Sequence, residues 1–170
     1  MQSGHAEHME HSGRVAPLSL SLGRALGLRG AELGELALAA RGHDTGKLAL
    51  PEHVLLKPGP LTEGEWALMR RHTLFGAHLL EAGRAPGASV RTALAHHENF
   101  DGSGYPFGLR SSDIPLFARI VALADTYDAL RAARSYKPAY SHARTMRLIL
   151  SARGTRFDPR LADAFLWLMN

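Results

Sequence analysis

The chain has 170 residues, a length that suits one domain with its own hydrophobic core, and we expect a single domain over residues 1–170. It contains no cysteine, so disulfides, thiolate metal sites and a cysteine nucleophile are excluded, and any transition-metal site must use His, Asp or Glu. The formal charge of +4 favours an anionic partner such as a nucleotide.

Apolar residues recur at helical spacing nearly throughout, and no segment alternates as a strand does. The sequence therefore predicts an all-α fold, a compact bundle of about seven helices. The first helix carries an apolar stripe from Val15 to Leu26 and ends near Gly27, and Pro17 predicts a kink or a later helix start. The second helix is predicted over residues 31–43.

A connection rich in proline and glycine, residues 50–60, leads to the clearest helix start in the chain. Thr62 and Glu65 have the spacing of a capping box, in which each side chain accepts a hydrogen bond from the other residue's backbone N–H. This third helix is predicted to run to about Ala82, and a fourth over residues 89–97.

A loop rich in Gly, Ser and Pro, residues 99–113, separates the fourth helix from a fifth over residues 115–132. Such a long loop within a compact domain is often functional. Two further helices are predicted after Ser141, a good N-cap, and after Asp158, an N-cap followed by proline at the first helical position.

Histidines and aspartates recur in an order that could build a metal site. Imidazole nitrogens and carboxylate oxygens suit divalent transition metals, and one aspartate can bridge two ions. A single histidine near an apolar helix face is more often a hydrogen-bonded structural residue, so each position alone leaves a structural role open. The candidates are His11, His43, Asp44, His72, His96, His97 and Asp125.

The order H…HD…H…HH…D resembles that of the HD-GYP family within the HD superfamily. The motifs that carry the resemblance are HDTGK at 43–47, HHENFDGSGYPFGL at 96–109 and DTYDALRAARSYK at 125–137. Connecting segments without ligands, such as IPLFARIVALAD before Asp125, resemble the family too. The resemblance implies an HD-domain helical bundle with a long loop, here called the GYP loop, over residues 99–113.

The resemblance implies two divalent metal ions, iron or manganese, with a hydroxide between them. The family pattern places His11, His43, Asp44 and Asp125 at the first ion, and Asp44 bridges to a second ion held by His72, His96 and His97. Glu7 lies four residues before His11, and a third ion there is left open. Among these residues His43 and Asp44, together with Lys47, are the expected catalytic residues.

Residues outside the ligand set are expected to bind substrate or to shape the site. The resemblance places Lys47, Arg134 and Lys137 at the substrate phosphates. Tyr105 either binds a phosphate or braces the GYP loop, whose signature residues also include Gly102, Gly104 and Pro106. Asp128 either orients a ligand or Lys47, or forms a surface ion pair.

The activity that the resemblance implies is hydrolysis of cyclic di-GMP to pGpG, and further to GMP. Three alternatives stay open: the same chemistry on another cyclic dinucleotide such as cyclic GMP-AMP, a non-hydrolytic domain that binds nucleotide or a partner, and an HD-type di-iron oxygenase. The phosphate-binding set of Lys47, Arg134 and Lys137 argues against the oxygenase.

The expected partners are a cyclic dinucleotide, a diguanylate cyclase or other regulator, and a second copy of the chain. We expect no nucleic-acid partner and no membrane partner, because no run approaches the ~20 apolar residues of a membrane span. We also expect a cytoplasmic location. Whether the domain stands alone or is a fragment of a longer sensor protein is left open.

Overall fold

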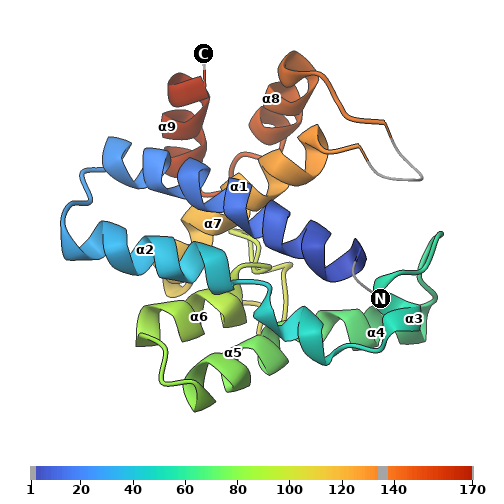
Figure 1. Ribbon diagram of the computed structural model, residues 1–170. Coiled ribbons are helices and arrows are strands. Elements are labelled where there is room, and N and C mark those ends of the chain that lie inside the picture. The colour runs from blue at the N-terminus through green and yellow to red at the C-terminus, as the bar shows by residue number, and fades with distance from the viewer. Residues whose placement is uncertain (1–2, 134–137, 170) are drawn as a thin grey trace.

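The computed structural model describes residues 3–133 and 138–169, with side chains described from residue 10 onwards. Over these ranges the chain is built from helices without a β-strand, which confirms the all-α prediction (Figure 1). No helix in the described part is both long and apolar enough to cross a membrane. The α-helices are α1 (Ser3–Ala25), α2 (Ala31–Gly42), α3 (Glu52–Leu55), α4 (Glu63–Arg70), α5 (His72–Ala82), α6 (Gly87–Ala95), α7 (Leu116–Arg131), α8 (His142–Ser151) and α9 (Pro159–Met169), with 3₁₀ helices η1 (Thr45–Ala49) and η2 (Ser111–Asp113).

Helices α1 and α7 form the centre of the fold. In Figure 1, α1 lies across α2 and α7, while α8 and α9 stand together at the end that carries the C-terminus. Helices α5 and α6 pair with each other on the other side of α2. The main core joins α1, α2, α7 and α9, and its fully buried side chains include Leu22, Leu36, Leu123 and Phe165. This core fixes the helices that bear the candidate ligands.

The first helix begins well before Pro17, where a later helix start was one of two expectations. Helix α1 starts at Ser3 and continues through Pro17 to Ala25, so the predicted later start is wrong. Proline removes only one N–H from the helical ladder, and a proline within a helix is tolerated when the packing of neighbouring turns compensates for that loss. Here Val15 and Ala16 are buried in the core immediately before the proline.

The predicted helix from Thr62 to Ala82 is two helices that meet at Arg71. The imidazole of His72 donates from Nδ1 to the carbonyl of Met69 at 2.8 Å, and the Thr73 hydroxyl donates to the carbonyl of Arg70 at 3.1 Å. These side chains satisfy carbonyls that backbone N–H groups four residues later would take in a continuous helix. Because of this break and the additional four-residue helix α3, the described residues contain nine α-helices, compared with about seven expected.

The predicted helix starts agree with the structure. Thr62 and Glu65 form the expected capping box. The Ser141 side chain accepts from the Arg144 N–H at 3.3 Å, and Asp158 Oδ1 accepts from the Arg160 N–H at 2.9 Å. Each of these contacts lies within four residues, which is why the sequence pattern predicts them well.

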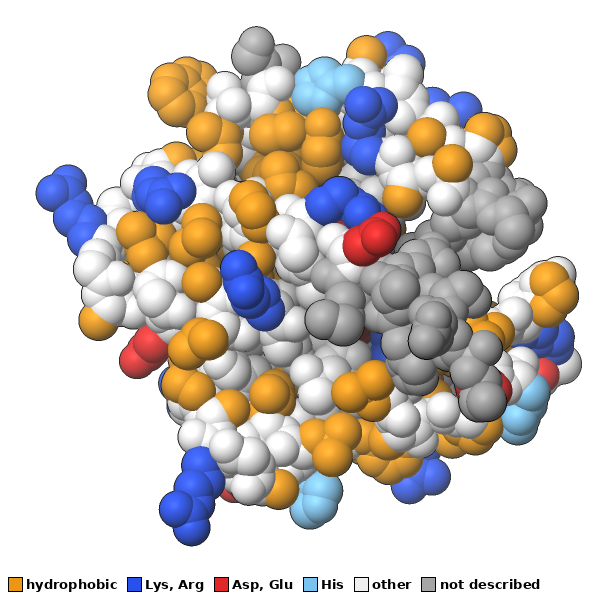
Figure 2. Space-filling view, in the orientation of Figure 1, with side chains coloured by type: hydrophobic (Ala, Val, Ile, Leu, Met, Phe, Trp, Pro, Cys, Tyr) orange, Lys and Arg blue, Asp and Glu red, His pale blue; other side chains and the backbone are white. Residues whose placement is uncertain are grey.

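The surface around α8 and α9 carries exposed apolar side chains. Figure 2 shows hydrophobic side chains gathered between these two helices, with Lys and Arg scattered around them. Leu150 and Trp167 are exposed by 53% and 77%. The inner sides of the same helices carry Ile149 and Phe165, which are fully buried. Each helix is therefore covered on one side only by the described residues.

Candidate metal centre

The seven candidate ligands assemble into two adjoining groups, although they come from segments spread over more than a hundred residues. Within each group the ligand atoms lie within 4.8 Å of one another. Helix α1 provides one ligand, the end of α2 two, the start of α5 one, the end of α6 two and α7 one. The groups are His11, His43 and Asp125, and Asp44, His72, His96 and His97.

Three of the histidines are held by backbone carbonyls that lie three residues earlier in the chain. Nδ1 of His43 lies 2.7 Å from the carbonyl oxygen of Ala40, Nδ1 of His72 lies 2.8 Å from that of Met69, and Nδ1 of His96 lies 2.9 Å from that of Ala93. A carbonyl oxygen can only accept, so each Nδ1 carries the proton and donates. The other nitrogen, Nε2, is left with a free lone pair, as a metal ligand requires.

These free nitrogens converge on Asp44. His43 Nε2 lies 3.4 Å from Asp44 Oδ2, while His72 and His96 place Nε2 3.4 and 3.6 Å from Asp44 Oδ1. Nε2 of His72 also faces Nε2 of His96 at 3.3 Å, so two lone pairs point at each other.

Buried polar atoms of this kind are costly without a partner, and His43 Nε2 and Asp44 Oδ1 have no hydrogen bond within the described part of the chain. A cation between these acceptors would satisfy all of them. The residues present therefore fit divalent metal ions.

His11 is held by a side chain. Its Nδ1 lies 2.7 Å from Asp128 Oδ2, and its Nε2 lies 3.0 Å from Asp125 Oδ1. Arg14 clamps the same carboxylate of Asp128 with two hydrogen bonds, at 2.8 and 3.1 Å. A carboxylate behind a histidine fixes the orientation of a ligand ring. Of the roles expected for Asp128, the structure shows the contact with His11, a candidate ligand, and not one with Lys47.

The ionisation of the second group suits metal binding. Burial raises the pKa of Asp44, but neighbouring groups, the charge of Lys47 foremost, outweigh burial and hold this pKa well below its usual range, so the carboxylate is ionised. Burial and the neighbouring His96 lower the pKa of His72 to about 4, and they also lower the pKa of His97. These two rings are neutral at pH 7 and keep their lone pairs.

The pKa of His11 is shifted in the opposite direction. Burial lowers it, but hydrogen bonds to Asp125 and Asp128 outweigh burial and raise the pKa of His11 to about 9. The protonated ring of His11 donates from Nε2 to Asp125 and from Nδ1 to Asp128. A metal ion at Nε2 would replace the proton there, because a metal binds the deprotonated nitrogen.

Lys47 lies at the rim of the same cluster. Its ammonium group is 2.5 Å from Asp44 Oδ2, and its side chain is 22% exposed, so the cation faces both the buried carboxylate and solvent. The short 3₁₀ helix η1 brings it there, three residues after Asp44. A positive group at this edge is placed to meet an anionic ligand that enters from solvent.

The GYP loop closes over His97. The ring of Tyr105 stacks on the ring of His97 with centroids 4.9 Å apart, and its backbone N–H donates to the carbonyl of His97 at 3.2 Å. Burial and the charge of Asp44 raise the pKa of the Tyr105 hydroxyl, so it stays protonated and able to donate. Tyr105 thus both braces the loop and borders the ligand cluster.

Two loop glycines are needed for different reasons. Gly102 has φ +83°, a backbone conformation that side chains disfavour. Gly104 approaches the preceding backbone so closely that an added Cβ would lie 2.2 Å from the Asn99 nitrogen. The Tyr105–Pro106 peptide bond is cis. Gly102 and Gly104 therefore shape the loop and supply no ligand side chain.

Sequence reasoning passed over Glu98, which anchors the loop from inside. The carboxylate of Glu98 accepts from the N–H groups of Phe107 at 2.7 Å and Leu109 at 3.2 Å, and the residue is only 3% exposed. An acidic residue directly after His96 and His97 was the available signal. Arg14, three residues after His11, was also passed over, because its partner Asp128 lies 114 residues away.

Three expected site residues cannot be located. Arg134 and Lys137 lie outside the described residues. Glu7 belongs to helix α1, but its side chain lies outside the described part of the chain. The predictions made for these three residues therefore stay predictions.

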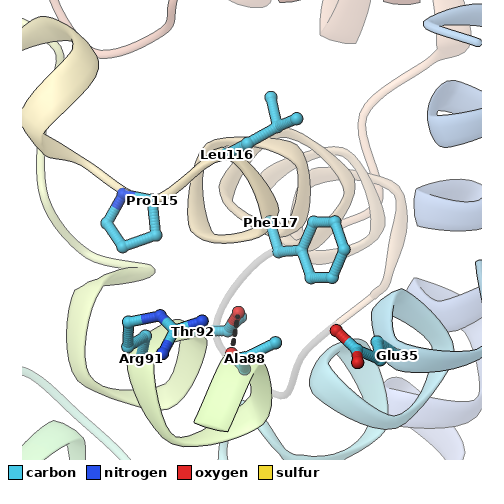
Figure 3. A pocket seen from close by; sticks show the side chains of 7 residues that line it. All are labelled: Glu35, Ala88, Arg91, Thr92, Pro115, Leu116 and Phe117. Atoms are coloured by element: carbon cyan, nitrogen blue, oxygen red, sulfur yellow. Dashed lines mark hydrogen bonds between the residues drawn. The ribbon is translucent and has the colours of Figure 1, made fainter. Parts of the chain in front are cut away.

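A surface pocket of about 310 Å³ lies apart from the ligand cluster. Figure 3 shows its walls, which come from α2, α6 and the start of α7, with Glu35 and Arg91 on different sides of it. Its apolar wall is formed by Pro115, Leu116 and Phe117. No candidate ligand lines the pocket, so the buried His/Asp cluster remains the candidate site.

Comparisons with known proteins agree with this geometry. The model of the family described as "HD domain" matches residues 3–161. A relative from Xanthomonas campestris, named cyclic di-GMP phosphodiesterase response regulator RpfG, is 45% identical over 165 residues, which cover 96% of this chain and 43% of the relative. A relative from Vibrio cholerae, named 3'3'-cGAMP-specific phosphodiesterase 2, is 38% identical and is matched over 92% of this chain and 30% of its own length.

A solved structure shares the fold. The structure titled "Bd1817, a HDG"Y"P protein" from Bdellovibrio bacteriovorus superposes with a TM-score of 0.77 and 22% identity, over 95% of this chain and 52% of that one. The chain spans less than half the length of either curated relative.

Proposed function

The chain belongs to the HD-GYP group of the HD domain family, and we propose that it is a metal-dependent phosphodiesterase that hydrolyses cyclic di-GMP to pGpG, and further to GMP. The observation that carries this proposal is the convergence of free histidine nitrogens and carboxylate oxygens around Asp44, at two adjoining groups of ligands. The name of the Xanthomonas relative supports the choice of cyclic di-GMP.

We assign one divalent ion to each group of ligands. His11, His43 and Asp125 would hold the first ion, and His72, His96 and His97 would hold the second, with Asp44 contributing to both. Ligand sets of histidine and carboxylate suit iron or manganese. A third ion at Glu7 stays a prediction, because the side chain of Glu7 lies outside the described part of the chain.

When bound, two such ions supply a water that ionises near neutral pH and positive charge against the phosphoryl oxygens. The residues of the chain prepare the site for this chemistry. Asp44 stays ionised and His72 and His97 stay neutral, which keeps all three able to bind a cation. Hydrolysis then adds the elements of one water across a P–O bond of the cyclic dinucleotide, and the linear product carries a terminal phosphate and a free hydroxyl.

Lys47 and Tyr105 border the site where the substrate phosphate binds. Lys47 offers a point charge at the exposed edge of Asp44, and Tyr105 offers a protonated hydroxyl beside His97. Arg134 and Lys137 are assigned to the same phosphates from the resemblance of their motif, although both lie outside the described residues. Together these groups would neutralise the two negative charges of the substrate.

A second substrate is favoured by one observation. The Vibrio relative named as specific for 3'3'-cGAMP is 38% identical and matches 92% of this chain, so a protein of similar sequence is named for a different cyclic dinucleotide. Hydrolysis of cyclic GMP-AMP is therefore the second candidate function. Regulation by a diguanylate cyclase or by a second copy of the chain stays a prediction.

The experiment that tests the function uses purified protein with its metals quantified and with Mn²⁺ or Fe²⁺ supplied. The protein is incubated separately with cyclic di-GMP and cyclic GMP-AMP, and the products are resolved by chromatography. We expect pGpG from cyclic di-GMP, and no product from a variant with His43→Ala and Asp44→Ala. A fully metallated protein that forms no product from either substrate would refute the hydrolase and favour a non-hydrolytic signalling domain.

A further inference from the structure

Arg70 lies at the edge of the candidate centre without an assigned role. It is the last residue of α4, and its guanidinium carbon is 5.4 Å from the centre of the Tyr105 ring. Tyr105 in turn stacks on His97, one of the candidate ligands. The three groups therefore form a row that leads from the ligand cluster outwards to an exposed arginine.

The Arg70 guanidinium has no hydrogen bond or ion pair with any described residue, and its side chain is exposed. Arg153, another exposed arginine, differs in this respect, because Asp163 pairs with it at 2.7 Å. Contact with the face of Tyr105 holds the planar guanidinium in place while its N–H groups stay available. Arg70 thus offers a positioned set of donors at the rim of the site.

The position of Arg70 suits contact with a base of the substrate better than contact with the reacting phosphate. Lys47 touches Asp44 directly, whereas the ring of Tyr105 stands between Arg70 and His97. A substrate phosphate at the ligand cluster would leave an attached base to extend outwards. Guanine presents two acceptors, O6 and N7, on one edge, and the fork of an arginine donates to both; adenine presents the N6 amino donor in place of O6. An arginine there favours guanine over adenine.

We propose that Arg70 is a specificity-determining residue that recognises the O6 and N7 edge of a substrate guanine. This inference rests on the proposed function, since it takes the substrate to be a guanine-containing cyclic dinucleotide. Arg70 is not a metal ligand and does not contact the candidate ligands directly. Its removal therefore changes substrate preference and leaves metal binding intact.

The test compares Arg70→Met with wild type on cyclic di-GMP, cyclic GMP-AMP and cyclic di-AMP. We expect kcat/KM for cyclic di-GMP to fall roughly tenfold to a hundredfold, mainly through KM, and the value for cyclic di-AMP to stay unchanged. Metal content stays at the wild-type level. Arg70→Lys keeps the charge without the fork, so it loses the preference for guanine as well.

The matched control is Arg71→Met. Arg71 is the next residue, and its guanidinium lies 5.3 Å from the ring of Phe75 in a similar contact, with a ring of α5 instead of the GYP loop. We expect this variant to behave as wild type on all three substrates. Equal losses on all three substrates in Arg70→Met would assign Arg70 to a phosphate and overturn the guanine role, as would no loss at all.

A failure of the proposed function gives a different pattern. If the metallated wild-type protein turns over none of the three substrates, the hydrolase is wrong, and equilibrium binding then decides the role of Arg70. Cyclic di-GMP and cyclic di-AMP are titrated into wild type and Arg70→Met. Weaker binding of cyclic di-GMP alone in the variant supports the inference, and identical affinities in the two proteins overturn it.

Discussion

The candidate ligands are held in place by two different means. His43, His72 and His96 donate to backbone carbonyls three residues earlier in their own segments. His11 instead depends on the side chain of Asp128, which lies 117 residues away and is clamped by Arg14. A ligand held by the backbone keeps its support under most substitutions, whereas a ligand held by side chains can lose its support through one change.

The largest effect is expected where the two groups meet. Asp44→Asn keeps the shape of the side chain but removes the charge that faces His43, His72 and His96. Loss of a residue that only orients a ligand typically lowers metal affinity roughly 10- to 100-fold. Because Asp44 is itself a candidate ligand, we expect a larger fall, and we expect it at both ions. Metal content after dialysis measures this. Two ions retained per chain in a folded Asn variant would contradict the assignment.

Asp128→Asn is expected to separate the two groups. The amide accepts less strongly from His11 and loses the charge that Arg14 binds, so affinity at the first ion falls roughly 10- to 100-fold. The second ion keeps its affinity, because none of its ligands contacts Asp128 and two of its histidines, His72 and His96, are held by backbone carbonyls. Stepwise removal of metal with a chelator measures the two affinities.

The control for that experiment is Arg14→Met, which leaves the His11–Asp128 contact in place and is expected to have a smaller effect. Equal weakening of both ions in Asp128→Asn would mean that the two groups are not held independently.

Glu98→Gln tests a third kind of support, in which a side chain holds backbone. The buried carboxylate accepts from two N–H groups of the GYP loop, and an amide offers only one acceptor in its place. We expect the free energy of unfolding to fall by about 1–3 kcal/mol, since hydrogen bonds to a charged acceptor are lost. Chemical denaturation measures this, and hydrogen exchange at Phe107 and Leu109 should quicken. Metal content stays unchanged; a loss of metal would show that the loop supports the ligands.

The smallest effect is expected at the start of α4, the helix whose last turn contains Met69, the carbonyl partner of His72. Lys57 and the backbone N–H of Thr62 lower the pKa of Glu65 from 4.5 to about 2. A folded-state pKa below that of the unfolded chain adds stability above about pH 4.5, and this contribution is lost as the pH falls towards 2.

The comparison is between wild type and Glu65→Gln in thermal unfolding from pH 6 to pH 2. Wild type should lose more stability over this range than the variant, by a small amount because the group is exposed. Identical slopes would show that the capping box contributes no pH dependence.

Much of the fold follows from contacts that are short in sequence. The capping box at Thr62 and the N-caps at Ser141 and Asp158 involve residues within four positions of each other, and the sequence predicts them correctly. The break at Arg71 was not predicted, although its contacts are local too. There the His72 and Thr73 side chains donate to two backbone carbonyls. The spacing of apolar residues does not indicate that side chains compete with the backbone for these carbonyls.

The sequence by itself determined the helical class, the family and the positions of the residues able to bind metal, because periodicity and ordered motifs are written along the chain. Only the tertiary structure decided how the candidate ligands are supported: Asp128 behind His11, Glu98 beneath the GYP loop and Arg70 against Tyr105. The physical reason is that packing of α1 against α7, and of the loop against the ends of α4 and α6, joins groups whose separation in sequence carries no signal of contact.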